Sequence, residues 1–360
     1  MAPNRPCLRR AVLVLAAMLF AGCSLPPPQP VTSTPTTTPF STPVTTIATS
    51  TMPTVTTPTT PPISSPLGFS GAAALAIVKE QVLDGNNTTR YRVPGTRGND
   101  EAAALIARDL RVAGWAVSYD VFNATYQCKD TLMHNVVGER AGTSGRIIIL
   151  GAHYDTRPIA ESDADPAGRT KPIPGANDGA SGVAVLLELA NVLALSNDTV
   201  RLVFFDGEDG GDMGDGCTDW LIGSRHYADS IPVAQWKNVS AMVLVDLVGD
   251  PNLVLPKEKL SQQGPGKLVQ QRIYEVGAGL GYGAIFTNDS TNSSRIQDDH
   301  QPFLEKQMPA VDLIHLVSPS DGYFPEWHHT QHDDLSHVSA ASLEAVGRTL
   351  EAWLESGVLS

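Results

Sequence analysis

The sequence predicts an α/β fold, in which helices flank a mixed, mainly parallel central sheet within a single domain. Two observations predict it. Segments with a helical period of apolar residues alternate with strand-like segments from about residue 67 to the end of the chain. Several strand-like segments are short, apolar and rich in β-branched residues, which is typical of parallel strands buried on both faces. No internal repeat is visible, so the alternation describes one large domain.

The amino-terminal elements of this domain are two helices and a strand. Residues 72–82 and 99–113 have the apolar spacing of helices. The second helix is expected to begin at Asn99, which suits an N-cap because acidic residues follow it in the first turn, and to stop at Gly114. Residues 115–122 have the pattern of a strand.

The middle of the domain contains three strands and two helices. Residues 132–138 are expected to form a strand. Residues 146–152 and 200–206 are apolar runs with few polar residues, which predicts two strands buried on both faces. Residues 179–195 lie between these runs as an apolar helix, and residues 219–228 form the next helix.

The last four elements continue the alternation. Residues 240–247 and 309–315 are expected to be buried strands, and residues 266–277 form a helix between them. Residues 340–356 are amphipathic and close the domain as a helix. This order of strands and helices predicts the mainly parallel sheet.

The chain begins with a segment typical of a secretion signal. Three arginines precede an apolar stretch at residues 11–20, which is too short to span a bilayer as a helix. The sequence up to Cys23 resembles a bacterial lipobox, although Leu is usual where Phe20 stands. We therefore expect residues 1–22 to be a signal peptide and Cys23 to be lipidated. Ordinary secretion with cleavage nearby is the alternative.

The next segment has the composition of a tether. Residues 24–66 are mostly Pro and Thr and contain no charged residue, so they lack the apolar surface needed for a core. We expect residues 23–66 to be the lipidation site and a disordered linker, and residues 67–360 to be the catalytic domain. The protein is then extracytoplasmic, either tethered to a membrane through its lipidated N-terminus or secreted.

The charge of the chain bears on its partners. The formal net charge is −13, and removal of residues 1–22, which contain three arginines and no acidic residue, leaves −16. This charge argues against a nucleic-acid partner and is compatible with a metal site and with peptide substrates. The membrane contact expected is the lipid alone, and the domain is expected to be a monomer.

Two cysteines remain outside the leader. Cys128 and Cys217 lack the CxxC spacing of a thiolate metal site. An oxidising compartment permits a disulfide between them, but two solitary cysteines are equally compatible with the spacing.

Residues of the kinds that bind metal follow the predicted strands or stand in Gly-rich turns. They are His153, Asp178, Glu208, Asp209, Asp246 and His329. A parallel sheet brings the carboxyl ends of its strands to one edge, so we expect these side chains to meet there. Two imidazoles and several carboxylates suit zinc, and a carboxylate that binds no metal can carry a proton. The pattern therefore predicts a metalloenzyme.

Several of these residues also have a simpler interpretation. As a zinc ligand, His153 would be oriented by Asp155, but alone it would be a polar residue at a strand end. Asp178 would be an N-cap or turn residue. Glu208 and Asp209 open a Gly- and Asp-rich loop that has the composition, though not the EF-hand spacing, of a calcium loop. Only the combination, with one such residue at the end of each of several strands, favours zinc.

Eight short motifs connect the chain with a known family. They are RVPG (92–95), HYD (153–155), GANDGASG (175–182), FFDGED (204–209), GSRH (223–226), DLVGDPN (246–252), IQDDHQPFL (296–304) and FPEWHHT (324–330). In these motifs and their order, the chain from Arg92 onward resembles the zinc-dependent glutaminyl cyclases and their relatives, the bacterial zinc aminopeptidases. The resemblance implies a zinc exopeptidase-like fold.

The resemblance implies roles for the metal-binding residues. Asp178, Asp209 and His329 match the residues that hold the zinc of the cyclases. In the aminopeptidases, Asp178 would bridge two metals, and His153 and Asp246 would complete the second site. The cofactor implied is thus Zn²⁺, one ion for a cyclase and two for an aminopeptidase.

The resemblance also implies roles in catalysis. Glu208 matches the general acid/base, and Asp246 and Asp298 match carboxylates that form a hydrogen-bonded network beside it. Gln297 and Phe324 match residues of the substrate pocket. The expected substrates are the N-termini of peptides or proteins.

The sequence departs from the family at three places. First, Asp209 stands where the zinc ligand is usually Glu. Second, His328 stands where the animal cyclases have an aromatic Trp, because Trp327 is displaced by one position. Third, the loop after Asp209 is long and rich in Gly and Asp. The last two departures concern substrate specificity more than the metal.

Three functions are compatible with these residues. The expected function is a glutaminyl-peptide cyclotransferase, which converts N-terminal Gln to pyroglutamate and releases ammonia. The alternative is a di-zinc aminopeptidase that hydrolyses N-terminal residues. A non-catalytic binding module with a structural metal is less favoured, because structural zinc sites are normally closed by thiolates and imidazoles.

Overall fold

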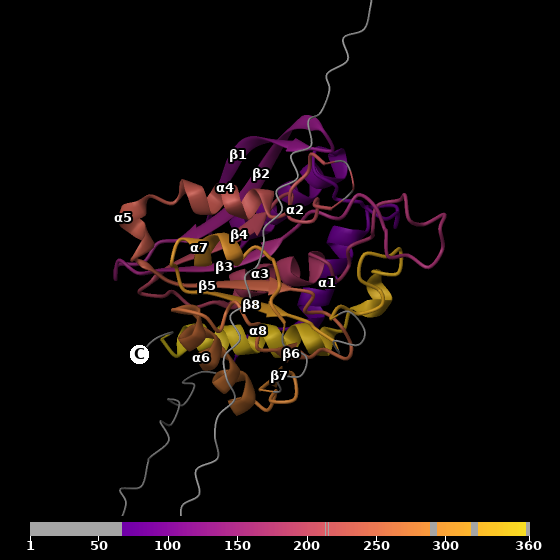
Figure 1. Ribbon diagram of the computed structural model, residues 1–360. Coiled ribbons are helices and arrows are strands. Elements are labelled where there is room, and N and C mark those ends of the chain that lie inside the picture. Colours follow the sequence, from indigo (N-terminus) through magenta and orange to yellow (C-terminus); the bar gives the residue numbers. More distant parts are fainter. Residues whose placement is uncertain (1–66, 213, 215, 289–293, 318–322, 358–360) are drawn as a thin grey trace, which may run out of the picture. The chain divides into compact units, whose positions relative to one another are not determined.

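The computed structural model describes residues 67–357 apart from 213, 215, 289–293 and 318–322 (Figure 1). The expected signal peptide at 1–22 and the lipidated linker at 23–66 lie outside the described residues, so both stay predictions. Among the helices that the structure describes, none has the length and apolarity needed to cross a membrane.

A six-stranded sheet forms the centre of the described part, in the order β1-β2-β4-β3-β5-β8. Strands β4, β3, β5 and β8 run parallel, whereas β1 pairs with β2 and β2 with β4 in antiparallel fashion. This confirms the predicted mixed, mainly parallel sheet. The strands are β1 (Ala116–Tyr126), β2 (Lys129–Arg140), β3 (Ile147–His153), β4 (Thr199–Phe205), β5 (Val239–Asp246) and β8 (Ala310–Ile314).

Helices cover both faces of this sheet (Figure 1). One face packs against α1, α2, α3, α6 and α8, and the other against α4, α5 and α7. A small second sheet, β6 (Leu255–Pro256) with β7 (Phe286–Thr287), was not predicted. The helices are α1 (Gly71–Val82), α2 (Arg97–Val112), α3 (Ala180–Val192), α4 (Ile222–Ser230), α5 (Val233–Trp236), α6 (Gly266–Gly279), α7 (Gln301–Glu305) and α8 (Ala340–Glu355).

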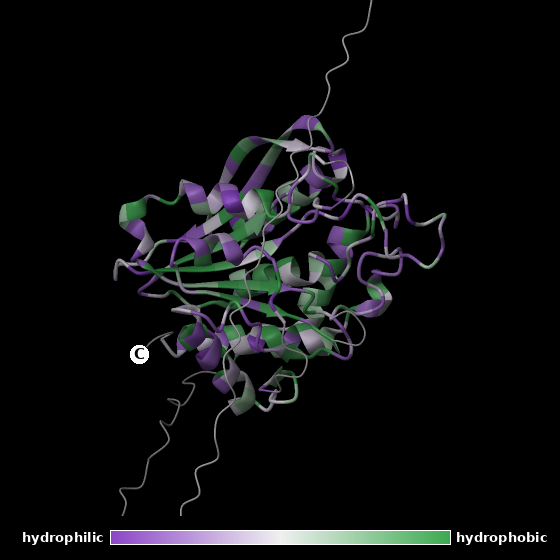
Figure 2. Ribbon diagram, in the orientation of Figure 1, coloured by the Kyte–Doolittle hydropathy of each residue, from purple (hydrophilic) through white to green (hydrophobic). Residues whose placement is uncertain are grey.

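The central strands are apolar on both sides because both sides are covered, as Figure 2 shows. In β3, Ile148 and Leu150 point to the face of α1 and α3, whereas Ile147 and Ile149 point to the face of α4 and α7. Alternate side chains thus enter two separate cores. The buried apolar runs in the sequence are explained by this arrangement.

The start of α2 corrects one expectation. The helix begins at Arg97 after Thr96, and Asn99 lies inside it. The buried Asn99 amide donates hydrogen bonds to the carbonyl oxygen of Arg92 at 3.1 Å and to Asp206 Oδ1 at 2.8 Å. Its polar side chain therefore connects α2 to the loop before it and to the end of β4, and does not cap the helix.

Two further helices begin or end away from the predicted residues. α4 starts at Ile222 and not at residue 219, because Leu221 has a φ of 61°, outside the right-handed helical region. α3 ends at Val192, three residues before the predicted limit at 195. Both differences lie at helix ends, where residue patterns are least informative.

Cys128 and Cys217 form a disulfide, which decides the question that their spacing left open. Cys128 lies at the tip of the hairpin formed by β1 and β2, and Cys217 lies in the loop that follows Glu208. The backbone N–H of Gln127 also donates to Thr218 Oγ1 at 2.7 Å. The hairpin tip is therefore fastened to the loop that leads away from the candidate site.

Candidate active site

The predicted site residues meet at the carboxyl edge of the parallel strands. His153 is the last residue of β3 and Asp246 the last of β5, while Glu208 and Asp209 follow β4. Asp178 reaches the same place from the turn before α3, where Gly179 has a φ of 72°. A Cβ atom on Gly179 would lie 2.6 Å from the carbonyl oxygen of His153, so this close approach requires glycine.

His153 lies at the centre of a first cluster of ligand-type atoms. Its Nε2 atom is 3.1 Å from Asp178 Oδ1 and 3.3 Å from Asp246 Oδ1, and its side chain is 1% exposed. Asp155 Oδ1 lies 3.4 Å from the other ring nitrogen. Among the described residues, neither nitrogen of His153 has a hydrogen-bond partner.

A second cluster lies on the other side of Asp178. The Nε2 atom of His329 is 3.2 Å from Asp209 Oδ1 and 3.8 Å from Asp178 Oδ2. Asp178 thus turns one oxygen toward each imidazole, as a residue shared by two sites would. The Oδ2 atoms of Asp178 and Asp209 are buried and have no hydrogen-bond donor among the described residues.

These donors fit a metal ion. A buried carboxylate oxygen without a donor is costly, and a divalent cation would satisfy it. Within the described residues, two sets of donors each lie within 4.8 Å of one another: His153, Asp178 and Asp246, and Asp178, His328 and His329. Carboxylates with imidazoles suit Zn²⁺. His328 is an additional candidate ligand, adjacent in the sequence to the expected ligand His329.

Asp209, expected as a zinc ligand, belongs to neither of these two sets. Its Oδ1 atom is 3.2 Å from Arg157 Nη1 as well as from His329. The shorter side chain, in place of the usual Glu, therefore divides its contacts between a guanidinium and an imidazole. Its Oδ2 atom is the one that remains for a cation.

The clustered carboxylates determine the electrostatics of the site. Burial acts to lower the pKa of His329, but Asp209, Glu161 and Asp178 together raise it to about 10. At His153, burial likewise opposes the proton, and Asp155, Asp178 and Asp246 raise its pKa well above the ordinary value. The site thus attracts positive charge, whether as protons or as a metal ion.

Three residues that the sequence analysis missed hold this cluster in place. Glu161 Oε1 lies 2.8 Å from His329 Nδ1, and Arg157 Nε lies 2.7 Å from the same carboxylate oxygen. The Trp220 ring lies 4.8 Å from the Arg157 guanidinium and 6.4 Å from the His329 ring. No ligand motif marks these residues; the nearest signal is that Arg157 and Glu161 follow HYD closely.

Two buried aspartates hold the backbone of the site. Asp155 accepts hydrogen bonds from the N–H groups of Glu208 at 3.1 Å and Asp209 at 3.2 Å. Asp333, which no pattern indicated, accepts from the N–H groups of Asn177 at 2.8 Å and Asp178 at 3.1 Å. Each carboxylate fixes one of the turns that present the ligand-type side chains.

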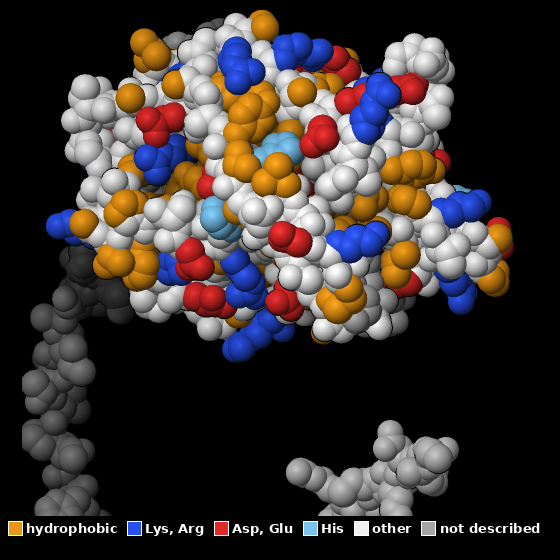
Figure 3. All heavy atoms as spheres, turned by 90° about the horizontal axis from the view of Figure 1, so that it is seen from above, with side chains coloured by type: hydrophobic (Ala, Val, Ile, Leu, Met, Phe, Trp, Pro, Cys, Tyr) orange, Lys and Arg blue, Asp and Glu red, His pale blue; other side chains and the backbone are white. Residues whose placement is uncertain are grey.

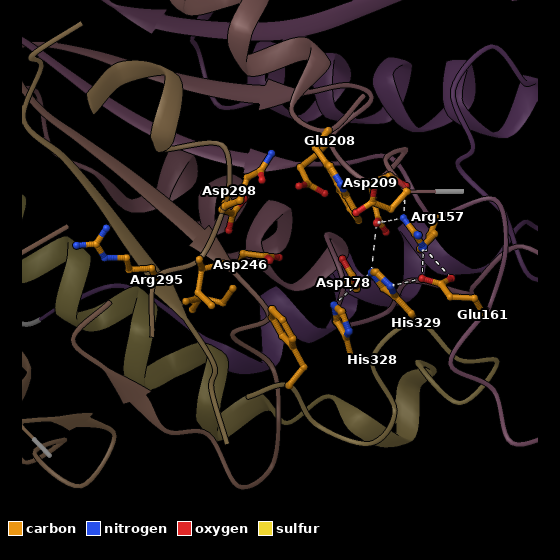
Figure 4. Close-up of a pocket in the computed structure, with 16 residues that line it drawn as sticks. Arg157, Glu161, Asp178, Glu208, Asp209, Asp246, Arg295, Asp298, His328 and His329 are labelled. Carbon is orange, nitrogen blue, oxygen red and sulfur yellow. Dashed lines mark hydrogen bonds and ion pairs between the residues drawn. The ribbon is translucent and has the colours of Figure 1, made fainter. Parts of the chain in front are cut away.

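A cavity of about 470 Å³ opens beside the candidate metal ligands. Gln297 and Phe324, expected in the substrate pocket, line it together with Glu208, Asp246 and Asp298. Figure 4 shows Glu208 and Asp298 on one side of this space and His328 and His329 on the other. Donor oxygens of Asp178 and Asp246 lie within 4.8 Å of one another.

Two acids of this cavity, Glu208 and Asp298, have a raised pKa. Burial raises the pKa of Glu208 well above its ordinary value, and Asp209 and Asp298 raise it further. Burial and the neighbouring Asp246 do the same for the pKa of Asp298. A carboxyl group with a raised pKa, next to a reacting centre, suits a group that both accepts and returns a proton.

The comparisons with known proteins agree with this geometry. Residues 135–354 match the model of peptidase family M28. The glutaminyl-peptide cyclotransferase-like protein of Bos taurus is 26% identical over 297 residues, which cover 73% of this chain and 71% of that protein. Two solved structures are similar at a TM-score of 0.72 and 30% identity. The glutaminyl cyclase of Porphyromonas gingivalis matches 79% of this chain and 98% of its own, and a leucine aminopeptidase precursor from Bacteroides thetaiotaomicron matches 81% and 99%.

Proposed function

We propose, from the premise that the chain belongs to peptidase family M28, that it is a zinc-dependent glutaminyl-peptide cyclotransferase. It would convert the N-terminal Gln of peptides or proteins to pyroglutamate and release ammonia. The observation that carries the proposal is the cavity, where Glu208 and Asp298 face Asp178 and His329 across a space large enough for a side chain. The similarity to glutaminyl cyclases supports it.

The reaction requires a proton carrier beside an activated amide. Zinc would supply Lewis acidity toward the side-chain carbonyl of the substrate Gln. The α-amine of the substrate attacks that carbonyl carbon, so a C–N bond forms in the ring while the bond to the side-chain nitrogen breaks. Because nucleophile and amide belong to one residue, orientation in the pocket lowers much of the barrier.

We assign the proton transfer of this reaction to Glu208. It lines the cavity and points away from Asp209, which contacts His329 (Figure 4). Its carboxylate would accept the proton of the attacking amine and return it to the leaving ammonia. Asp246 and Asp298 would hold the shared proton beside it, consistent with the raised pKa of both buried groups.

The alternative, a di-zinc aminopeptidase, rests on one specific observation. Asp178 faces both His153 and His329, and Asp246 lies 3.3 Å from His153, so the donors of both metal sites are present. We assign one zinc to Asp178, Asp209 and His329 for the cyclase, with His153 and Asp246 as the second site of the aminopeptidase. The non-catalytic binding module is set aside, because the chain is an enzyme of this superfamily.

The cellular location proposed for the enzyme rests on the expected signal peptide and on the disulfide. The bond between Cys128 and Cys217 fits an oxidising compartment. We propose an extracytoplasmic monomer with a signal peptide at 1–22, tethered through a lipid on Cys23, or otherwise secreted. On the face drawn in Figure 3, acidic and basic side chains are interspersed, which fits the proposal of no nucleic-acid partner.

Ammonia release and metal content test the proposal together. Purified protein is incubated with a Gln-initiated peptide while ammonia is followed, and its zinc is counted by elemental analysis. Ammonia release with one zinc per chain is the expected result. Release of amino acids without ammonia, with two zinc ions per chain, would contradict the cyclase proposal and support the aminopeptidase.

A further inference from the structure

One short segment delivers both Gln297 and Asp298 to the cavity. It runs from Ile296 to His300, immediately before α7, and has no regular secondary structure of its own. Besides a turn in which the N–H of Gln301 donates to the carbonyl oxygen of Asp298 at 2.8 Å, contacts from other parts of the chain shape it.

A single buried carboxylate contacts both ends of this segment. Glu258, which is 0% exposed, accepts a hydrogen bond from the N–H of Ile296 through Oε1 at 3.2 Å. Its Oε2 atom lies 3.4 Å from His300 Nε2. Glu258 thus bridges the two ends of the five-residue segment that contains Gln297 and Asp298.

Glu258 is itself firmly held. Its Oε1 atom accepts from the N–H of Leu260 at 2.7 Å, and its Oε2 atom accepts from the N–H of Ser261 at 2.6 Å and from Ser261 Oγ at 2.7 Å. Ser261 Oγ accepts in turn from the N–H of Asp312, in β8, at 2.9 Å. Glu258 is therefore connected through Ser261 to strand β8 of the central sheet.

The charge on Glu258 is stabilised where it lies. Burial acts to raise its pKa, but His300 and the N–H groups of Leu260 and Ser261 lower the pKa below its usual range. On its other side, the His300 ring approaches Asp312, with Nδ1 3.9 Å from Oδ2. A buried, ionised carboxylate with this many donors is a rigid anchor, because moving any donor away leaves charge uncompensated.

We infer that Glu258, together with His300, is a positioning residue that sets Gln297 and Asp298 in the cavity. Neither lines the cavity or belongs to the candidate ligand sets, so their effect passes through the Ile296–His300 segment. The inference rests on the proposed function only for the identity of the reaction. A displacement of about 1 Å in a reacting geometry can cost about 100-fold in rate, so a small shift of the segment should be measurable.

The test is Glu258→Gln. The substitution keeps the size of the side chain, removes the charge that faces His300, and directs an amide N–H₂ toward backbone donors. We expect zinc content to stay at the wild-type level, while kcat/KM for a Gln-initiated peptide falls about 10- to 100-fold. Both constants should change, since Gln297 is assigned to binding and Asp298 to proton transfer.

Glu351→Gln is the matched control. Glu351 is 2% exposed and accepts from the N–H groups of Gly68 at 2.7 Å and Phe69 at 3.0 Å, in α8 and away from the cavity lining. Loss of a purely structural carboxylate should lower the melting temperature and leave kcat and KM unchanged in assays well below that temperature. Glu258→Gln should differ from this control in both constants.

Two results would overturn the inference. The first is a folded, zinc-loaded Glu258→Gln variant with wild-type kcat and KM. The second, measured where Glu258→Gln does not fold, is wild-type kcat and KM in His300→Gln, a change that leaves the other hydrogen bonds of Glu258 intact. If wild-type protein releases amino acids and not ammonia, the proposed function fails, and the same variants are compared on that hydrolysis in the same cavity.

Discussion

Glu161 Oε1 lies 2.8 Å from Nδ1 of His329, on the side of the ring opposite to Nε2, which faces Asp209 and Asp178. Burial acts to raise the pKa of Glu161, but His329 and Arg157 lower it to about 2, so the carboxylate is ionised. An ionised acceptor at Nδ1 fixes the tautomer of the ring and leaves Nε2 free for a cation. The orientation of His329 thus depends on a residue that binds no metal itself.

Glu161→Ala should therefore weaken zinc binding about 10- to 100-fold, the usual cost of removing the partner of a ligating histidine. Competition with a chromophoric chelator measures the dissociation constant. Glu344→Ala, which removes a carboxylate paired with Arg348 on α8, serves as the control and should bind zinc as the wild type does. An unchanged dissociation constant for zinc in Glu161→Ala would contradict the proposed role of Glu161 in orienting His329.

Asp178→Ala should remove most of the zinc without unfolding the domain. Asp178 is the candidate ligand whose oxygens face both His153 and His329, so no other residue replaces it. The turn should persist, because Asp333 bonds the backbone N–H of residue 178 and not its side chain. Elemental analysis and circular dichroism measure the two properties. Full zinc retention would contradict the assignment.

Glu208→Gln should abolish most turnover and leave the metal in place. The amide keeps the size of the side chain but accepts no proton, and loss of a general acid/base typically costs about 10²–10⁴ in rate. Steady-state kinetics, with zinc counted in the same preparation, gives both numbers. Turnover at the wild-type level would show that the proton moves by another route.

The stability of the domain should fall in mild acid partly through His315. Burial lowers the pKa of His315, which is 2% exposed and bonded to the backbone of Val254. The unfolded chain, with a pKa of about 6.5 at this residue, then binds a proton more readily than the folded chain. The contribution of neutral His315 to the free energy of unfolding is therefore fully present above about pH 6.5, and it is lost as the pH falls below that value.

His315→Asn removes the titrating group, so the difference between the pH profiles of the wild type and the variant gives the contribution of His315. The free energy of unfolding of the wild type should drop more between about pH 7.5 and about pH 5.5 than that of the variant, whatever the constant offset between them. Urea denaturation at several pH values provides the comparison. Parallel pH profiles for the two proteins would contradict the prediction.

Much of this structure could be predicted from residues close together in the sequence. The buried strands at 146–152, 200–206 and 240–247 have a composition that only full coverage explains, and the topology rule then places their last residues together. His153, Glu208, Asp209 and Asp246 were singled out in this way, whereas the ligand roles of Asp178 and His329 came from the family resemblance; all these roles stay predictions.

The residues that were missed act over long distances in the sequence. Glu161 meets His329, Asp333 meets Asp178, and Glu258 meets His300, each through a pairing of ordinary polar residues without a motif. Asn99 was misassigned for the same reason, since its partner is Asp206 and not its own helix end. Local patterns report the element in which a side chain lies, whereas tertiary structure selects its partner.

The central claim is that the cavity cyclises an N-terminal Gln, and mass spectrometry of one reaction mixture tests it most directly. Because the attack is intramolecular, the account predicts that a Gln-initiated peptide loses ammonia, about 17 mass units, while every residue stays in the chain. The same peptide with an N-terminal Ala should be unchanged, and the Glu208→Gln variant should leave the Gln peptide intact. Loss of the whole first residue, from either peptide and without an ammonia-loss product, would contradict the account.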